Sequence, residues 1–183
     1  TQISRFDKWK DPIGVIDAFE LIRKKVNCRL VLMGSIATDD PESQLVYDQV
    51  LKKTKHHRDI TLIHSENHIL VNALQTVSSV IIQKSLREGF GLTVSEALWK
   101  GTPVVAGNVG GIPLQIIDGK NGFLVGSVRE CAEKTIKILK DKKLEKSMGK
   151  IGKEYVRKNF LITRHLLDYI EILKYVFNNK SNS

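Results

Sequence analysis

The chain has 183 residues, of which 42% are hydrophobic and 27% are charged, a composition typical of one globular domain with its own core. No apolar run approaches the roughly 18 residues that a membrane span needs, and we expect no signal peptide, so the composition argues against a membrane protein and favours a cytoplasmic location. The two cysteines, Cys28 and Cys131, are too few for a disulfide framework. The formal charge of +9 favours anionic partners, either phosphorylated metabolites or nucleic acid, unless it serves solubility alone.

Short apolar runs alternate with helical patterns through the first half of the chain. Asp11 is a helix N-cap followed by Pro12 at the first helical position, Asp40 and Pro41 repeat that signal, and Asn67 is a third cap. The predicted elements are a strand at 1–4, a helix at 12–22, a strand at 29–33, a helix from 41 to about 57, a strand at 60–64 and a helix at 68–77.

The same alternation continues in the second half. Gly101 and Pro103 stop one helix, and Ser127 with Glu130 forms a capping box that starts another. The predicted elements are strands at 80–83, 104–106 and 122–125, and helices at about 92–100, 127–140, 144–159 and 162–177. The polar tail at 178–183 is predicted to be loose.

Strands that alternate with helices indicate an α/β fold with a parallel sheet. We predict a Rossmann-like, three-layer arrangement of about six strands with helices on both faces. Ligands bind such sheets at the carboxyl ends of the strands. The candidate site is therefore formed by the loops that follow the strands, at 5–11, 34–40, 64–68, 85–91 and 107–113.

One of these loops has the composition of an anion-binding turn. Gly89, Phe90 and Gly91 lead directly into a helix, and glycine lets a backbone approach a ligand closely. A helix N-terminus presents free N–H groups and about half a positive charge, which suits a phosphate. Arg5 and Lys10 lie on the first loop at the same end of the predicted sheet and could close over the same anion.

Two glutamates flank this turn, Glu88 before it and Glu96 in the helix after it. A carboxylate beside a phosphate repels it, unless it accepts hydrogen bonds from hydroxyl groups on either side of the phosphate. A sugar–diphosphate–ribose ligand has that arrangement. The alternative readings are that Glu96 only complements the helix dipole, that Glu88 is a solvated loop residue, and that Arg5 and Lys10 are surface charges.

The segment EGFGLTVSEA resembles the Glu-(seven residues)-Glu signature of retaining glycosyltransferases with the GT-B fold, the large family that includes sucrose synthase. Three further blocks, SRFDKWKDP, LVLMGS and KGTPVVAGNVGGIPLQIIDGKNGFLV, resemble that family in the correct order. The resemblance implies that residues 1–177 form the C-terminal nucleotide-sugar-binding half of such an enzyme. It also implies that the N-terminal acceptor domain is absent from this chain.

The resemblance implies a role for each site residue. Arg5 and Lys10 would bind the diphosphate and stabilise charge on the leaving group, and with Glu88 they are the expected catalytic residues. Glu88 would face the transferred hexose and Glu96 the ribose hydroxyls. The base would lie against the loop at His64 to Glu66, and Gly34 would also belong to the nucleotide-sugar site. The backbone of the turn would complete the site, through Gly89, Phe90, Gly91, Leu92 and Thr93.

Within the family, the blocks FDKWKDPIGVIDAF, GSIATDDPE and NVGGIPLQI most resemble trehalose synthases, which use a nucleoside-diphosphate glucose, and next trehalose phosphorylases. The chain departs from the family at Ser4, often Gly, and at Lys84-Ser85, often Pro-Ser. The nucleotide base, the acceptor and any Mg²⁺ dependence stay open. Part of the apolar face of the last helix is expected to be exposed or used in self-association, for example in a homodimer.

Two other classes compete with this reading. A GT-B sugar-nucleotide epimerase shares the fold but not the spaced glutamates. A nucleic-acid-binding module accounts only for the charge, and 7% aromatic residues without an RNA motif argue against it. The histidines, among them His56, His57 and His68, do not show the spacing of a zinc site, so we predict no metal ligands and no required cofactor.

Overall fold

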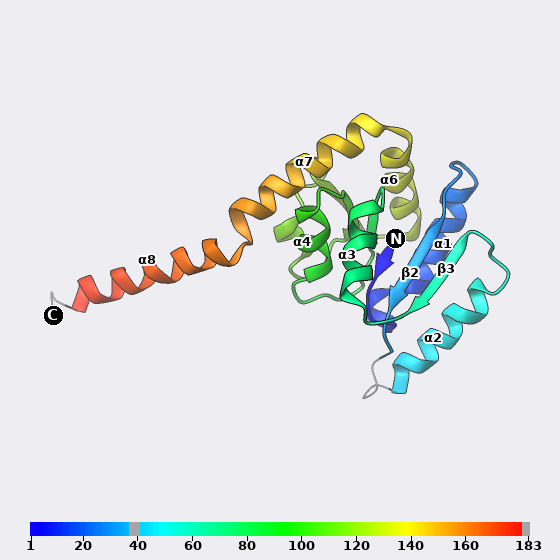
Figure 1. The fold of residues 1–183 in the computed structure, drawn as a ribbon, viewed down its shortest axis with the longest axis horizontal. Coiled ribbons are helices and arrows are strands. Elements are labelled where there is room, and N and C mark those ends of the chain that lie inside the picture. The colour runs from blue at the N-terminus through cyan, green and yellow to red at the C-terminus, as the bar shows by residue number, and fades with distance from the viewer. Residues whose placement is uncertain (37–40, 181–183) are drawn as a thin grey trace.

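The computed structural model describes residues 1–36 and 41–180 (Figure 1). The strands are β1 (Gln2–Ile3), β2 (Leu30–Gly34), β3 (Ile60–His64), β4 (Ile81–Gln83), β5 (Val104–Gly107) and β6 (Gly122–Val125). The helices are the short 3₁₀ turn η1 (Lys8–Lys10), α1 (Pro12–Arg23), α2 (Pro41–Thr54), α3 (His68–Val77), α4 (Leu92–Trp99), α5 (Ile112–Gln115), α6 (Val128–Lys140), α7 (Lys142–Asn159) and α8 (Ile162–Lys180).

All strand pairings are parallel, in the orders β1-β2-β3 and β4-β5-β6. Two backbone hydrogen bonds at Thr1 join these three-stranded sheets. The N–H of Ile82 donates to the carbonyl of Thr1 (2.8 Å), and the backbone nitrogen of Thr1 donates to the carbonyl of Val80 (3.0 Å). The strands therefore lie side by side in the order 3-2-1-4-5-6, the order of doubly wound nucleotide-binding folds.

The prediction of one continuous six-stranded sheet needs a correction. β1 has two residues and β4 has three, so they share too little backbone to form a ladder of their own. The result is two abutting sheets with Rossmann-like topology, and the α/β class is confirmed.

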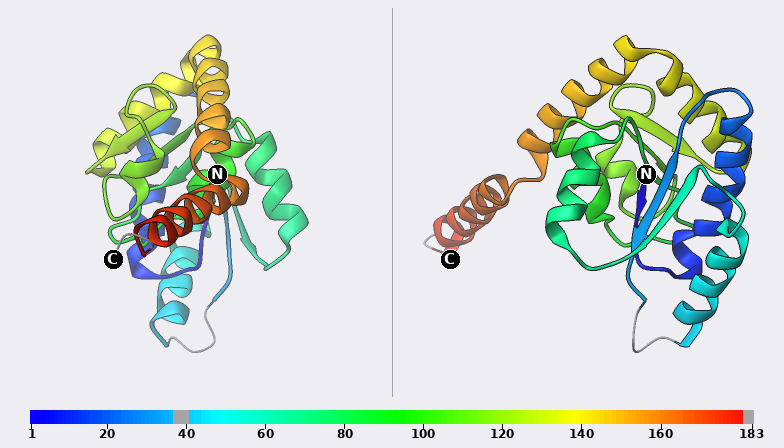
Figure 2. Two further views of the ribbon diagram at one scale, coloured as in Figure 1. Left: turned by 90° about the vertical axis from the view of Figure 1, so that its left-hand side faces the viewer. Right: turned by 45° about the vertical axis from the view of Figure 1, so that its right-hand side comes forward.

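Each face of the sheet has its own hydrophobic core, because successive strand residues point to opposite faces. Leu32, Ile82 and Val105 pack on one face with α1, α2 and α6. Met33, Ile81 and Val104 pack on the other with α3, α4 and α5. Helices therefore cover both faces, and Figure 2 shows this layered arrangement from two sides.

The C-terminal helices behave differently from each other. Helix α7 packs at both ends, with Met148 in the first core and Val156 in the second. Helix α8 extends away from the rest of the molecule in Figures 1 and 2. Its large apolar side chains are exposed, as expected, for example Leu166 at 59% and Phe177 at 66%.

Element ends differ from the predictions at a few places. Helix α2 stops at Thr54, because a turn at Lys55 and His56 precedes β3, rather than continuing to His57. Helix α8 continues to Lys180, so residues 178–180 of the expected tail are helical, whereas 181–183 lie outside the described residues. The predicted cap at Asp40 also falls outside them. The short elements η1 and α5 have too few residues for a periodic pattern and were not predicted.

Candidate functional site

A cleft lies at the point where the strand order reverses, between the carboxyl ends of β1 and β4. This is where ligands bind in doubly wound sheets. The loops after these strands, 4–11 and 84–91, are joined by a hydrogen bond from the N–H of Leu86 to the carbonyl of Trp9 (2.7 Å). They enclose a cavity of about 370 Å³ that is lined by Ser4, Arg5, Lys10, Gln83, Glu88, Phe90, Gly91, Leu92 and Thr93.

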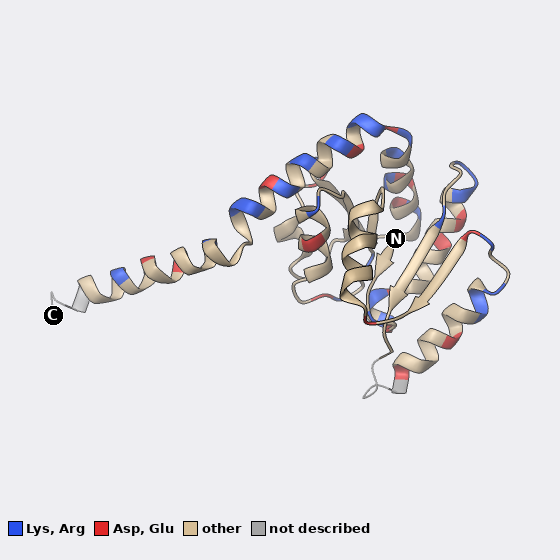
Figure 3. Cartoon of the chain, viewed as in Figure 1, with Lys and Arg blue, Asp and Glu red and all other residues tan. Residues whose placement is uncertain are grey.

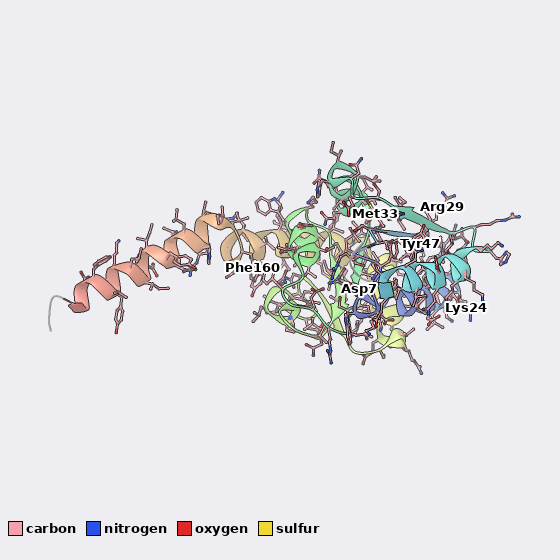
Figure 4. All side chains as sticks on the ribbon, turned by 90° about the horizontal axis from the view of Figure 1, so that it is seen from below. Asp7, Lys24, Arg29, Met33, Tyr47 and Phe160 are labelled. Carbon is pink, nitrogen blue, oxygen red and sulfur yellow. The ribbon has the colours of Figure 1, made fainter. Side chains whose placement is uncertain are left out.

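Figure 4 orients this end of the sheet. Met33, near the carboxyl end of β2, and Asp7 of the first loop lie toward the middle of the molecule. Arg29, just before the amino end of β2, and Lys24 lie at the right-hand side of the view. Phe160 marks the junction of α7 and α8. Its ring packs edge-on against Phe90 of the glycine turn, with ring centroids 5.6 Å apart.

The N-terminus of α4 opens on this cleft. Gly91 is the N-cap residue, with φ 86° and ψ 63°, a left-handed conformation that glycine adopts without steric cost. No side chain caps the helix, and the N–H of Val94 donates to the carbonyl of Gly91 (2.9 Å), so the amides of Leu92 and Thr93 remain available to a ligand. The turn is braced from behind, because the N–H of Gly111 donates to the carbonyl of Gly89 (2.6 Å) and Gln115 donates to the carbonyl of Phe90.

Lys10 and Glu88 contact each other at the floor of the cleft. Nζ of Lys10 lies 2.6 Å from Oε2 of Glu88, and the two side chains are 18% and 10% exposed. Ser85 and Gln83 also donate to this carboxylate, at 3.2 and 3.4 Å. The residues expected to hold the diphosphate and the hexose therefore neutralise each other in this structure.

The surroundings of Glu88 shift its pKa. Burial alone raises the pKa of this carboxyl group. The hydrogen bond from Lys10 and its positive charge, together with the hydrogen bonds from Ser85 and Gln83, outweigh burial and lower the pKa below its usual value. Glu88 is therefore an anion at neutral pH, ready to accept hydrogen bonds from hydroxyl groups.

Arg5 and Trp9 stand at the rim of the cleft. The guanidinium of Arg5 is largely exposed and lies 3.4 Å from Oδ2 of Asp7. A second hollow, of about 270 Å³, lies beside the first and shares Arg5, Lys10 and Glu88 with it. Trp9 lines this second hollow, and the guanidinium of Arg87 lies 4.3 Å from the centroid of its ring.

Glu96 lies on α4, five residues after Gly91, and is exposed. The buried amide of Gln75, on α3, donates to its Oε2 at 2.7 Å and fixes the orientation of the carboxylate. Thr93 lies one turn earlier on the same helix, and its hydroxyl donates to the carbonyl of Ile3 (3.3 Å). Glu96 therefore contacts α3, whereas Glu88 contacts the first loop.

A third hollow, of about 300 Å³, extends from the first toward β2 and β3. It is lined by Ile3, Ser4, Arg5, Met33, Gly34, Ser35, Ser65, Glu66, His68, Val71 and Thr93. Gly34 is required here for close packing, since a Cβ at this position would stand 1.7 Å from the carbonyl oxygen of Ser4.

The side chain of His64 has another environment. It is exposed at the end of β3, and its ring centroid lies 5.4 Å from that of Tyr47 on α2. Ser65, Glu66 and His68 line the hollow in its place. The sequence pattern brings together Arg5, Lys10, Glu88 and the glycine turn. It indicates no role for His68 or Arg87, because a single basic residue carries no pattern.

Within residues 1–36 and 41–180, no three His, Cys, Asp or Glu side chains come together as a group that could hold a metal ion. In the same part of the chain, no helix is long and apolar enough to cross a membrane. Figure 3 shows Lys and Arg along most of α7, and part of that charge is paired locally, since Glu154 contacts Arg157 at 2.7 Å and Lys158 at 3.4 Å.

The fold and the position of the cleft define a Rossmann-like α/β domain. The chain belongs to the family described as glycosyl transferases group 1, whose model matches residues 1–155. This confirms the family expected from the spaced glutamates and the blocks around them.

Curated relatives match over most of this chain but less than half of their own length. The trehalose synthase of Thermococcus litoralis is 46% identical over 180 residues, which are 94% of this chain and 43% of that protein. The trehalose phosphorylase of Grifola frondosa is 37% identical over 171 residues, 85% of this chain and 23% of that protein.

Solved structures share the fold. The sucrose-phosphate synthase of Thermosynechococcus elongatus superposes with a TM-score of 0.81 at 23% identity, over 97% of this chain and 45% of that one. The Anabaena protein Alr3699/HepE, solved in complex with UDP-glucose, superposes with a TM-score of 0.79 at 21% identity, over 95% of this chain and 48% of that one. The chain is thus similar to one of the two Rossmann-like halves of a GT-B glycosyltransferase.

Proposed function

We propose that this chain is the donor-binding half of a retaining glucosyltransferase, which transfers glucose from a nucleoside-diphosphate glucose to a sugar acceptor. The acceptor is glucose and the product trehalose, in line with the 46% identity to a trehalose synthase. One observation carries the proposal. The uncapped N-terminus of α4 faces a cleft that also holds two cations, Arg5 and Lys10, and the carboxylate of Glu88.

Each part of the cleft then has a partner on the donor. The diphosphate lies against the amides of Leu92 and Thr93, with Arg5 and Lys10 around it. The base lies in the hollow beside Gly34, and Glu96 accepts hydrogen bonds from the ribose. Glu88 accepts hydrogen bonds from the hexose. His64 contributes through its loop, because its ring packs on Tyr47.

The catalytic contribution of this half is electrostatic. When the glycosidic bond breaks, negative charge develops on the leaving diphosphate, and Arg5 and Lys10 stabilise it. Removing one such contact typically costs a factor of about 10² to 10³ in rate. In a front-face substitution, which retains configuration, the leaving diphosphate also takes the proton of the acceptor hydroxyl. The acceptor pocket lies mainly in a second domain of the enzyme.

Donor binding requires Lys10 and Glu88 to exchange each other for groups of the ligand. Lys10 and Glu88 contact each other in this structure, so the donor has to separate them and bind both. The ammonium group moves from a carboxylate to a phosphate, and the carboxylate moves from an ammonium group to sugar hydroxyls. Neither ion is left unpaired, which keeps the free-energy cost of the exchange low.

The second candidate is a trehalose phosphorylase, which the 37% identity to the Grifola frondosa protein favours. It uses the same half to hold a glucosyl group and phosphate, without a nucleotide. A nucleoside diphosphate binds tightly under the first proposal and weakly under the second.

Calorimetric titration of the chain tests the proposal. The ligands are UDP-glucose, ADP-glucose and GDP-glucose, the matching nucleoside diphosphates, inorganic phosphate, and a single-stranded RNA, each at two salt concentrations. We expect one nucleotide sugar and its diphosphate to bind at a single site. Binding of inorganic phosphate but of no nucleotide favours the phosphorylase. RNA binding that falls steeply with salt, without nucleotide binding, contradicts both.

A further inference from the structure

Two ion pairs of opposite polarity join the loops on either side of the cleft. The neighbouring residues Lys10 and Asp11 lie on the first loop, and Glu88 and Lys84 lie on the second. Lys10 pairs with Glu88, and Asp11 pairs with Lys84. Each loop therefore contributes one cation and one anion, and two ion pairs link the loops although they are more than 70 residues apart in the sequence.

The cation of the Asp11–Lys84 pair is more deeply buried than the cation of the Lys10–Glu88 pair. The Lys84 side chain is 7% exposed, against 18% for Lys10. Neither Asp11 nor Lys84 lines the cavity at the switch point, whereas Lys10 and Glu88 both do. The donor can therefore reach the Lys10–Glu88 pair but not the Asp11–Lys84 pair.

The backbone of Asp11 is held in an unusual conformation. Among the described residues, it is the one non-glycine residue with a positive φ, at φ 48° and ψ 52°. Such a conformation costs free energy and persists only where the surroundings require it. Here the carboxylate has two tasks, because Oδ1 also accepts the N–H of Gly14 (3.0 Å) and caps α1.

Gly14 leaves room for this carboxylate. A Cβ at position 14 would stand 2.2 Å from Oδ2 of Asp11, the oxygen that pairs with Lys84. Lys84, the residue that directly follows β4, supplies the cation for this oxygen. The left-handed backbone, the glycine and the lysine all serve the same contact.

We propose that Asp11 and Lys84 are positioning residues, whose ion pair stays closed and keeps the two loops in register while the donor opens the Lys10–Glu88 pair. The inference rests on the proposed function. Once Lys10 binds the diphosphate and Glu88 the hexose, the Asp11–Lys84 pair still links the two loops, together with the hydrogen bond from Leu86 to Trp9. It fixes the distance between the two residues that must bind neighbouring groups of one ligand.

The test compares variants that break the buried pair in different ways. Lys84→Gln removes the cation, and Lys84→Arg keeps it. Asp11→Asn with Lys84→Gln removes both charges and leaves no unpaired ion, while asparagine still caps α1. The control, Arg23→Gln, removes the same charge from the other end of α1, where Arg23 contacts Asp59 at 2.8 Å. This control also measures how far a lost positive charge weakens anion binding in general.

Binding is measured by calorimetry with UDP and UDP-glucose, or with the ADP or GDP pair if the wild-type chain prefers that base. We expect Lys84→Gln to lower the affinity for the nucleotide sugar about tenfold or more. The affinity for the diphosphate should fall less, because Arg5 and the amides of α4 still bind phosphate. The affinities of the Lys84→Arg and Arg23→Gln variants for both ligands should stay within about threefold of the wild-type values. If Lys84→Gln does not fold, the double variant is expected to show the same selective loss.

The outcomes separate this inference from the proposed function. A wild-type chain that binds no nucleotide overturns both. A wild-type chain that binds, together with a Lys84→Gln or double variant that binds the nucleotide sugar equally well, overturns the positioning role alone. Equal weakening by Arg23→Gln, or no rescue by Lys84→Arg, also overturns it.

Discussion

Gly110 lies so close to Glu88 that a Cβ built on the glycine would stand 1.7 Å from the carbonyl oxygen of the glutamate. Gly110 also has a positive φ of 56°. The loop after β5 therefore supports the backbone of Glu88 from behind, and only a residue without a side chain fits between them.

We accordingly expect Gly110→Ala to destabilise the fold by more than about 1 kcal/mol, because the new methyl group meets backbone that cannot move without displacing Glu88. Thermal unfolding measures this. Gly89→Ala is the matched control, since nothing lies within 4 Å of a Cβ at that position, and it should leave the melting temperature unchanged. Equal melting temperatures for the two variants would contradict the role given to this loop.

The Lys10–Glu88 pair predicts a dependence of stability on pH. The pKa of Glu88 is lowered in the folded state, so its contribution to stability is fully present above the unfolded-state value of about 4.3 and is lost as pH falls through the lower folded-state value. Glu88→Gln should therefore lower the melting temperature at neutral pH, and the difference from wild type should vanish in strong acid.

Melting curves from about pH 7 down to about pH 2 check this. Glu133→Gln is the control, because Glu133 pairs with Arg129 on an exposed surface, and exposed pairs contribute little. A difference between Glu88→Gln and wild type that is the same at every pH would show that charge on Glu88 is not what stabilises the loop.

The thiol of Cys131 should be inert in the folded protein. It is fully buried, and burial raises its pKa to about 12, so hardly any reactive thiolate forms near neutral pH. In a Cys28→Ser variant, we expect a thiol reagent to label Cys131 only as fast as the protein unfolds. Prompt, stoichiometric labelling without denaturant would show that α6 opens locally.

The isolated chain should not transfer glucose by itself. Its cleft is open to water, and positioning of the acceptor needs the other half of the enzyme. We expect no trehalose from nucleotide-glucose and glucose with this chain, while a full-length trehalose synthase run in parallel gives product. Trehalose formation by the chain alone would mean that the acceptor pocket lies within these 183 residues.

The strand–helix order, and with it the fold class, could be predicted because it depends on local patterns and caps such as Asn67, whose side chain accepts from the amides of Ile69 and Leu70. The break between the two sheets could not be predicted, since it depends on how few residues β1 and β4 share. The four-residue helix α5 is too short to carry a periodic pattern.

For the site, the loops and the glycine turn followed from the sequence, but the pairing of their side chains did not. Lys10 and Glu88 are separated by 78 positions, and no local rule brings them together. The orientation of the His64 ring could not be predicted either, for a different reason. It is the last residue of β3, and its orientation depends on the ring of Tyr47 across the contact with α2.

The central claim is that the cleft binds a nucleotide sugar, with Glu96 on the ribose side and Glu88 on the hexose side. Calorimetry of Glu88→Ala and Glu96→Ala with a nucleoside diphosphate and with its glucose ester gives four affinities that test it directly. We predict that Glu96→Ala lowers the affinity for both ligands by a similar factor of roughly 10 to 150, which corresponds to the loss of one charged hydrogen bond. Glu88→Ala should weaken only the sugar nucleotide, because losing Glu88 leaves Lys10 free for the diphosphate. If Glu88→Ala instead lowers the affinity for the diphosphate as much as Glu96→Ala does, the two glutamates do not divide the ligand between them, and the proposed binding mode is wrong.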